Sequence, residues 1–286
     1  MKMNSCQHKN HIHYKNMKEV YTIFSPHNPL LISKIGGKHS DKLKKSITAW
    51  EHIRQKIYNI DPQKIIIIMP EYSKFNNISI NQCESYSINF KDFGDLSAGF
   101  EVMGDMDFST KLKYFLRKND FPVSIFSDSE INYKSFVPFY FLNQYHVFSK
   151  GPDKDIKQES KNTEFIIINC SASDLSYHLK FGKLLFDFIK KSDEKIVVIA
   201  CGDFAKEIKK EDRKSIEELL KLFVDSIKNK KYNDFLKYTN QFENGNYLGI
   251  KPFAVISNHL LEQKLTPNIL SIDIEFKEIY LTCEFE

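Results

Sequence analysis

The sequence predicts a single α/β domain in which a central, mixed and mostly parallel sheet carries helices on both faces. Short runs rich in β-branched residues alternate along the chain with segments of helical periodicity, an order typical of parallel sheets. The 286 residues and the hydrophobic fraction of 42% suffice for one sizeable core. Glycine and proline, at 10 and 9 residues, are too scarce for long low-complexity linkers.

The first predicted unit has the order strand, helix, strand. Residues 20–24 and 64–69 are short apolar runs of strand length. Between them, residues 41–58 are a predicted helix because their apolar side chains recur at the spacing of one helix face. These side chains are Leu43, Ile47, Trp50, Ile53, Ile57 and Tyr58. We therefore expect a βαβ unit at the start of the domain.

The middle of the chain continues the alternation less regularly. Polar and apolar residues alternate over residues 85–90, which predicts a strand. A helix is expected at residues 109–118, and another strand at 122–126. Residues 137–142 are a buried apolar segment, and residues 150–162 have the Lys, Asp, Ser and Gly content of a surface loop.

The C-terminal half returns to regular alternation. Strands are predicted at residues 164–169 and 195–200, with a helix at 175–190 between them. Further helices are expected at residues 212–227, 233–238 and 251–261. The last predicted strand, residues 277–285, is expected to close the sheet as an edge strand. No internal repeat is visible.

The charge pattern and the apolar runs exclude two classes of partner. The 41 basic residues are interleaved with 37 acidic ones, for a net charge of +4, so the chain lacks the basic stripe that phosphate-backbone binding needs. No run reaches the roughly 18 apolar residues of a membrane-spanning helix. We expect neither a nucleic-acid partner nor a membrane. The amino terminus lacks the apolar centre of a signal peptide, which predicts a cytoplasmic location.

Residues 1–18 and the cysteines are interpreted as lying outside any site. The first 18 residues are polar and are expected to form a disordered tail, despite three histidines. The five cysteines are widely spaced with no C-x-x-C pair, which favours reduced thiols over disulfides or a zinc cage. Cys170 and Cys201 each follow or end a predicted strand and are expected to pack in the core.

A histidine, His27, follows the first predicted strand within Pro26-His27-Asn28-Pro29. Open α/β sheets collect ligand-binding groups outside the carboxyl ends of their strands, so His27 is a candidate metal ligand. A histidine between two prolines also suits a hydrogen-bonded turn. The residues alone leave both interpretations open.

This motif and several later segments resemble the LigB-type class III extradiol ring-cleavage dioxygenases, including their Memo-like relatives. The similar segments are Pro26-His27-Asn28-Pro29-Leu30-Leu31-Ile32 with Ile35-Gly36-Gly37, Met69-Pro70, Phe136-Val137-Pro138-Phe139-Tyr140-Phe141-Leu142, Ile199-Ala200-Cys201-Gly202-Asp203-Phe204, Gly249-Ile250-Lys251-Pro252 and Leu270-Ser271. Their shared order implies a LigB-like domain over residues 19–286.

The resemblance implies a reaction and a cofactor. Active family members hold non-haem iron(II) by two histidines and a carboxylate, and leave coordination positions open for a catechol and dioxygen. Three protein ligands on one side fix the metal and keep the adjacent positions free. Histidines near the metal serve as general acid and base.

Among the metal-ligand positions, only His27 keeps the family residue. The second family histidine, in a Pro-His dipeptide, corresponds to Glu71, whose carboxylate is still able to bind a divalent metal. The third ligand position falls on Tyr247 or Leu248. Leucine cannot ligate, and a tyrosine would have to ionise from an unperturbed pKa of about 10.

The catalytic histidines of the family are also replaced. Their positions correspond to Tyr133 and Lys206. A buried lysine of lowered pKa beside a tyrosine is able to act as an acid–base pair, but we favour a solvated lysine and a packing aromatic. Asp203 is expected to cap the following turn. His178 lies in a segment that echoes the family pattern one unit too early, and we interpret this echo as a coincidence.

Two functional hypotheses remain open. In the first, the chain is a divergent family member with a lost or altered iron site that binds a small aromatic molecule or a protein partner in the old cleft. In the second, it is an active dioxygenase or related oxidoreductase that uses His27 and Glu71 to hold Fe(II) or another divalent metal and acts on a catechol-like substrate. The substitutions favour the first, because two groups cannot enforce a facial geometry. The resemblance also raises the expectation of an oligomer.

Overall fold

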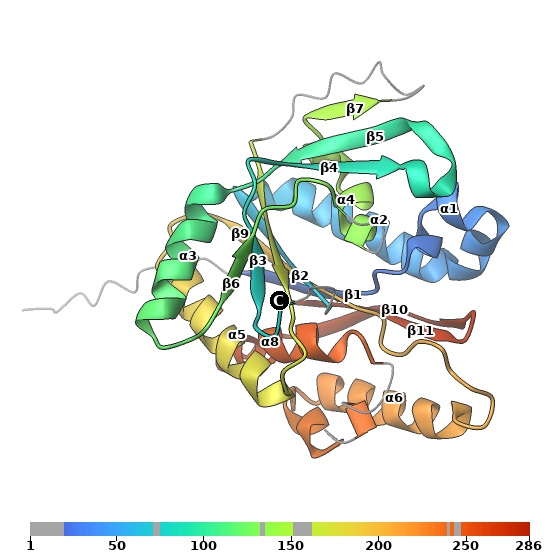
Figure 1. Cartoon of the computed structure of the whole chain (residues 1–286). Coiled ribbons are helices and arrows are strands. Elements are labelled where there is room, and N and C mark those ends of the chain that lie inside the picture. Colours follow the sequence, from blue (N-terminus) through green and yellow to red (C-terminus); the bar gives the residue numbers. More distant parts are fainter. Residues whose placement is uncertain (1–19, 71–74, 132–134, 151–161, 239–240, 243–246) are drawn as a thin grey trace, which may run out of the picture.

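The computed structural model describes residues 20–70, 75–131, 135–150, 162–238, 241–242 and 247–286 (Figure 1). The predicted tail, Glu71 and Tyr133 lie outside these residues, so what was expected of them stays a prediction. Within the described part, none of the helices combines the length and apolar character needed to span a lipid bilayer.

The chain forms a single α/β domain around a mixed sheet of eight strands in the order β10-β11-β1-β9-β2-β8-β3-β6 (Figure 1). The strands are β1 (Tyr21–Ser25), β2 (Lys64–Met69), β3 (Ser79–Asn81), β6 (Ser124–Phe126), β8 (Glu164–Asn169), β9 (Ile196–Cys201), β10 (Pro267–Glu275) and β11 (Glu278–Phe285). The four central strands, β1, β9, β2 and β8, are parallel, whereas β11 runs antiparallel to β1 and β3 antiparallel to β8. The carboxyl ends of the central strands therefore meet at one edge.

The central strands form because their sequences are apolar on both sides of the pleat. β2 reads KIIIIM and β9 reads IVVIAC, and every residue of both is buried. Continuous apolar runs of this kind belong to parallel strands covered on both faces. Ile65 pairs with Phe165 of β8 and with Val197 of β9, so β2 is locked between two equally apolar neighbours.

Helices cover both faces of the sheet. The helices whose bounds lie in the described residues are α1 (Ser33–Gly36), α2 (Lys44–Ile60), α3 (Met106–Lys118), α4 (Phe136–Phe141), α5 (Leu175–Ile189), α6 (Arg213–Lys228) and α8 (Ile250–Glu262). Short 3-10 turns lie between them at η1 (Pro29–Leu31), η2 (Gly37–Leu43), η3 (Lys91–Phe93), η5 (Asn143–Tyr145) and η6 (Asp234–Tyr238). Figure 1 shows α2 and α4 on one side of the sheet, and α3, α5 and α8 on the other, with α6 beyond α8.

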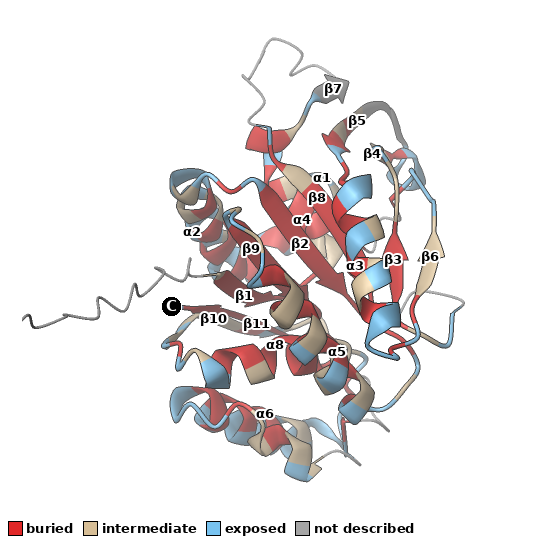
Figure 2. Ribbon diagram, turned by 90° about the vertical axis from the view of Figure 1, so that its left-hand side faces the viewer, coloured by how far each residue is buried: buried red, intermediate tan, exposed pale blue. Residues whose placement is uncertain are grey.

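The core divides into two clusters, one on each face of the sheet. Alternate residues of β2 belong to different clusters. Ile66 and Ile68 pack in the cluster with α3, α5, α6 and α8, and Ile65 and Ile67 pack in the cluster with α2 and α4. Figure 2 shows the central strands as the most continuously buried part of the molecule. Because alternate side chains of a strand point to opposite faces, burial of both sets requires helices on both faces.

A second, smaller sheet covers part of the α2 and α4 side. Its strands β4 (Ser85–Phe90), β5 (Asp95–Met103) and β7 (Phe148–Lys150) are antiparallel, in the order β4-β5-β7. Burial alternates strictly along β4, as the sequence of residues 85–90 predicted. The buried members Tyr86, Ile88 and Phe90 join the core cluster on that face.

The structure corrects the predicted edge of the sheet. β11 is not an edge strand, because it lies between β1 and β10, and β10 occupies the edge. The two strands form a hairpin whose turn residues Phe276 and Lys277 have φ of 53° and 61°. Such turns usually contain Asn or Gly, so this turn carries no sequence signal. β3, β5 and β7 were also not predicted, and the expected helix at 233–238 is a 3-10 turn.

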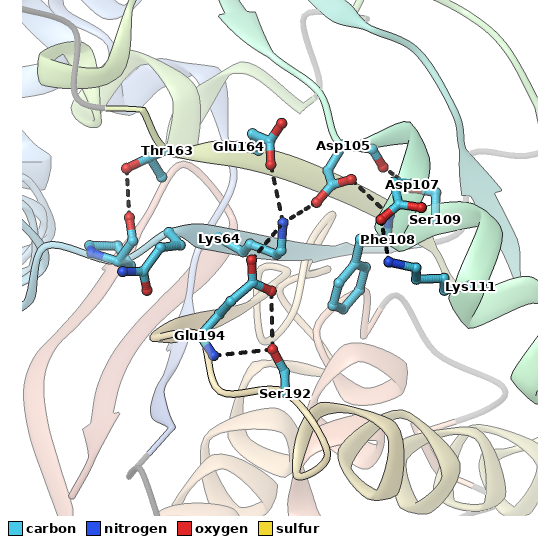
Figure 3. A network of polar contacts seen from close by, with 12 residues as sticks. Lys64, Asp105, Asp107, Phe108, Ser109, Lys111, Thr163, Glu164, Ser192 and Glu194 are labelled. Atoms are coloured by element: carbon cyan, nitrogen blue, oxygen red, sulfur yellow. Dashed lines mark hydrogen bonds and ion pairs between the residues drawn. The ribbon is translucent and has the colours of Figure 1, made fainter.

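A buried lysine fastens the amino ends of the central strands, at the opposite edge from the loops described below (Figure 3). The Lys64 side chain is only 9% exposed and forms ion pairs with Asp105, Glu164 and Glu194. Burial alone would lower the pKa of Lys64, but hydrogen bonds from its ammonium to these carboxylates raise it above the ordinary value. Asp105 also accepts a hydrogen bond from the Phe108 amide and so caps α3. Lys64 therefore joins β2, β8 and α3.

Lys64→Met is expected to lower the free energy of unfolding by about 3–5 kcal/mol, because it leaves the buried Asp105 carboxylate without its cation. Urea denaturation at neutral pH measures the effect. Lys214→Met, at an exposed position of α6, is the control and should change stability by less than about 0.5 kcal/mol. Equal stability of the two variants would contradict the structural role of Lys64.

Candidate functional site

Three segments bring polar side chains together at the carboxyl edge of the central strands. β1 ends at Ser25, two residues before His27, and β9 ends at Cys201, two residues before Asp203. β11 runs antiparallel to β1, so its first residue, Glu278, lies at the same edge. Parallel strands place their following loops side by side, which explains how residues far apart in sequence meet here.

His27 and Asp203 are joined by reciprocal hydrogen bonds. The His27 amide donates to Asp203 Oδ1 at 3.2 Å, and the Asp203 amide donates to His27 Nδ1 at 3.1 Å. Both residues are 3% exposed. Because Nδ1 receives an N–H, the neutral imidazole carries its proton on Nε2. Asp203 Oδ2 lies 3.3 Å from Nδ1 and would accept a hydrogen bond from it if the ring became charged.

This geometry corrects the expected role of Asp203. Its carboxylate does not cap the turn that follows β9 but accepts the His27 amide of the neighbouring loop. Asp and Asn often cap their own turn. Here β1 and β9 are paired in parallel, with Ser25 opposite Cys201. This pairing brings the His27 amide within hydrogen-bond distance of the Asp203 carboxylate.

Glu278 extends the cluster on the β11 side. Its Oε2 accepts a hydrogen bond from the Asn28 side-chain amide and another from the Tyr280 hydroxyl, the latter at 2.8 Å. Burial and the nearby Asp203 carboxylate raise the pKa of Glu278 above its usual value. Burial and Glu278 likewise raise the pKa of Tyr280. The cluster therefore holds two carboxyl groups close enough to influence each other.

Two glycines bring a fourth segment against this edge. The Gly249 amide donates to the Asp203 carbonyl at 2.9 Å. A Cβ on Gly202 would lie 2.3 Å from Gly249 Cα, and one on Gly249 would lie 2.7 Å from the Gly202 carbonyl oxygen. Only glycine at both positions allows the backbones to approach this closely. The turn that carries Tyr247 and Leu248 is thereby held beside the loop of Asp203.

Tyr247 is half-buried and packs against aromatic residues of the core. Its ring makes edge contacts with Phe204 and Phe242, with centroids 5.7 Å and 5.2 Å away. Burial, and then the Asp212 carboxylate, raise the pKa of the Tyr247 phenol. A metal-bound phenolate needs the opposite shift. The surroundings of Tyr247 therefore oppose the predicted ligand role.

Lys206 lies in the position of a solvated lysine. One third of its side chain is exposed, and its Nζ lies 3.7 Å from the carboxylate of Glu207, which is itself 70% exposed. These surroundings support the solvated interpretation that the sequence favoured. The predicted partner Tyr133 and the predicted ligand Glu71 fall outside the described residues, so their roles beside Lys206 and His27 stay predictions.

His178 makes its hydrogen bonds within a different loop, the connection between β8 and α5. Its Nδ1 lies 2.7 Å from the Asp174 carbonyl oxygen, and its Nε2 accepts a hydrogen bond from the Ser171 amide at 3.2 Å. Burial lowers the pKa of this imidazole to about 4, so it is neutral near pH 7. Both ring nitrogens serve the connection between β8 and α5, which agrees with the interpretation of the family echo as a coincidence.

Sequence reasoning found His27 but missed Glu278 and Tyr280. Asn28 belonged to the same motif as His27, yet no role was assigned to it. Its partner Glu278 is 250 positions away and belongs to a strand whose place beside β1 had not been predicted. The only available signal was a carboxylate next to the start of the last strand. The role of that carboxylate becomes visible only from the sheet order, which places β11 beside β1.

The described residues do not fit a facial iron triad. Among them, no set of three or more His, Cys, Asp or Glu side chains is arranged to hold a metal ion. At the ligand position that the resemblance implies, the Leu248 side chain has no donor atom and the pKa of Tyr247 is raised. Among the described residues, His27 alone matches a ligand that the resemblance implies, and its Nδ1 already accepts a backbone hydrogen bond.

Comparison with known proteins gives a family match over most of the chain. The model of the catalytic LigB subunit of aromatic ring-opening dioxygenase matches residues 21–265. The matched segment includes the loops of His27, Asp203 and Tyr247, and it ends before β10 and β11.

Two individual proteins are also similar. Protein CA_C1420 of Clostridium acetobutylicum is 23% identical over 198 residues, which are 65% of this chain and 39% of that protein, so the chain spans about two fifths of its length. The crystal structure of an uncharacterized protein, JW3007 from Escherichia coli K12, superimposes with a TM-score of 0.55 at 12% identity and covers 94% of this chain and 100% of its own. The second similarity is one of fold.

Gly249→Ala is expected to lower the free energy of unfolding by about 1–3 kcal/mol, because the added methyl group would overlap the backbone of Gly202. Urea denaturation of the variant beside Thr48→Ala, an exposed control in α2, measures this cost. A Gly249→Ala protein as stable as the control would show that the two loops do not approach as closely as described.

Glu278→Gln is expected to gain stability relative to the native chain as the pH rises. The folded-state pKa of Glu278 is raised, so ionisation of this carboxyl opposes folding; the penalty is absent below the unfolded-state pKa and develops as the pH rises through the folded-state value. Glutamine keeps an acceptor for Asn28 and Tyr280 without the charge. Urea midpoints of both proteins at about pH 4 and about pH 8 test the sign. A difference that shrinks with rising pH would contradict it.

Proposed function

Because the chain belongs to the family of the catalytic LigB subunit of aromatic ring-opening dioxygenases, we propose that it is a divergent member whose non-haem iron site is lost or altered. Its role would be to bind a small molecule or a protein partner at the carboxyl edge of the central strands. The observation that carries the proposal is the orientation of the His27 imidazole.

A histidine that ligates a metal through one ring nitrogen almost always donates the N–H of the other nitrogen to a carboxylate or a carbonyl. In His27 the direction is reversed, since Nδ1 accepts the backbone N–H of Asp203. For Nε2 to offer a lone pair, the proton would have to move to Nδ1, where it would face the donated N–H. Metal binding would therefore replace the hydrogen bond from the Asp203 amide by one to Asp203 Oδ2, which lies 3.3 Å from Nδ1.

The other described family positions support the same proposal. Iron(II) in this family needs three protein ligands to fix its geometry. Position 248 is a leucine, and the tyrosine beside it is held among aromatic rings with a raised pKa. A lysine replaces one of the proton-transferring histidines, and its ammonium stays partly solvated. The chain thus keeps the scaffold of the family and changes the groups that perform its chemistry.

The groups at this edge suit binding by hydrogen bonds and charge. Lys206 supplies a partly exposed cation, while Asp203, Glu278 and Asn28 form the hydrogen-bonded network that holds the surrounding loops. A few polar groups at the end of an apolar sheet are typical of small-molecule sites in α/β proteins. We propose binding at this edge without ring cleavage.

The alternative is an active Fe(II) dioxygenase or related oxidoreductase acting on a catechol-like substrate. Family membership and the retained His27 favour it, with Glu71 as a further ligand. Bound iron would supply the means to bring a catechol and dioxygen together. In that case the residues of this chain would hold and orient the substrate and exclude water around it.

Protein prepared anaerobically with Fe(II) and then desalted is expected to retain well under one iron per chain and to consume no oxygen with a panel of catechols. Metal analysis and an oxygen electrode provide the two measurements. The reason is that the described donors cannot enforce a facial triad.

His27→Ala and His52→Ala make a matched pair for this experiment, since His52 lies on α2 with half of its side chain exposed. Stoichiometric iron in the native chain and in His52→Ala, lost in His27→Ala and accompanied by oxygen uptake, would overturn the proposal in favour of the active enzyme.

A further inference from the structure

The β10–β11 hairpin lies beyond the family match, yet its start is attached to the loop that carries Lys206. The Phe204 amide donates to the Ile279 carbonyl at 2.9 Å, and the Ile279 amide donates to the Ala205 carbonyl at 2.8 Å. The Ile208 amide donates to the Lys277 carbonyl at 2.9 Å. These backbone bonds form a short antiparallel bridge. The hairpin therefore fixes the chain that follows β9.

The same hairpin reaches the loop of His27 through one side chain. Glu278 accepts from the Asn28 side-chain amide, and the fully buried Tyr280 donates its hydroxyl to the same oxygen. The Asn28 side-chain oxygen accepts a hydrogen bond from the Leu30 amide at 2.9 Å and so caps the turn η1. Both ends of the Asn28 carboxamide are thus in use, and Asn28 directly follows His27.

We propose that Glu278 is a positioning residue that holds the His27 loop in place through Asn28. The inference rests on the proposed function in placing the site at His27, and it adds the β10–β11 hairpin to that site. Glu278 lies outside residues 21–265, so the family match assigns it nothing.

The chemistry of the contact suits a positioning role. A carboxylate is an acceptor only, so its oxygens bind the two donors that Asn28 and Tyr280 present. Hydrogen bonds to an ionised acceptor are roughly twice as strong as those between neutral groups. Glu278 directly follows the two turn residues, Phe276 and Lys277, whose positive φ defines a tight reversal. The carboxylate therefore sits on a short and well-fixed hairpin.

The same loop is fixed independently on its other side. The Asp203 carboxylate accepts a hydrogen bond from the His27 amide, and the Asp203 amide donates one to His27 Nδ1. Removal of Glu278 should loosen the Asn28 side of the loop and leave the Asp203 side in place. The expected effect is a local change in the His27 ring, with global folding retained.

Imidazole signals of the full chain, labelled with ¹⁵N at histidine, test the inference. In the native protein the His27 Nδ1 signal should be that of a nitrogen that accepts a hydrogen bond from the Asp203 amide. In Glu278→Ala these signals should shift or broaden, and the Leu30 amide should exchange with solvent roughly fivefold faster as its cap loosens. Glu278→Gln keeps an acceptor for both donors and should restore the native signals.

Glu262→Ala is the control, because Glu262 forms an ion pair with Lys190 on the surface and lies in α8. Asn28→Ala removes the link itself and should reproduce the Glu278→Ala change, which keeps the inference testable if Glu278→Ala does not fold. Unchanged His27 signals in Glu278→Ala, or in Asn28→Ala where the first variant fails, would overturn it, as would an equal change in the control.

The iron experiment and the imidazole experiment test the two proposals independently. Stoichiometric iron with oxygen uptake would contradict the proposed function and leave the link between Glu278 and His27 intact. Unchanged His27 signals would remove the link and leave the assignment of a lost or altered iron site intact.

Discussion

Two reciprocal hydrogen bonds between His27 and Asp203 hold together the loops on which the candidate site depends. They are possible because β1 and β9 are adjacent parallel strands that end opposite each other. The close approach of Gly202 and Gly249 then adds the turn of Tyr247, and the β10–β11 hairpin adds Glu278. In this arrangement the imidazole is a structural acceptor within a buried network.

In the proposed function, the chain keeps the scaffold of its family without the family's chemistry. The family match covers the loops at the carboxyl edge, including the buried histidine. At the expected ligand position Tyr247 packs against aromatic rings, and at an expected catalytic-histidine position Lys206 is partly solvated. The proposed loss of metal ligands would leave the fold intact, because the buried residues of the two apolar clusters and the Lys64 ion pairs at the opposite edge do not include these positions.

The sequence predicted the parts of the fold that depend on local pattern. β2, β8 and β9 are continuous apolar runs, and the amphipathic helices α2, α5 and α6 show their periodicity directly. β10 and the placement of β11 were missed, because the hairpin turn at Phe276 and Lys277 lacks the usual residues. The position of His27 was also predictable. The direction of its hydrogen bond and its link to Glu278 depend on contacts 176 and 250 residues away in sequence, which no local pattern contains.

The most direct measurement is an anaerobic titration of the histidine-labelled chain with Zn(II), a diamagnetic probe, followed through the ¹⁵N imidazole signals of His27. If this ring is a structural acceptor bound to the Asp203 amide, its signals should stay unchanged at one equivalent of metal and beyond. A stoichiometric shift of the His27 signals, absent from the spectrum of His27→Ala, would show that the histidine is a metal ligand and would contradict the account.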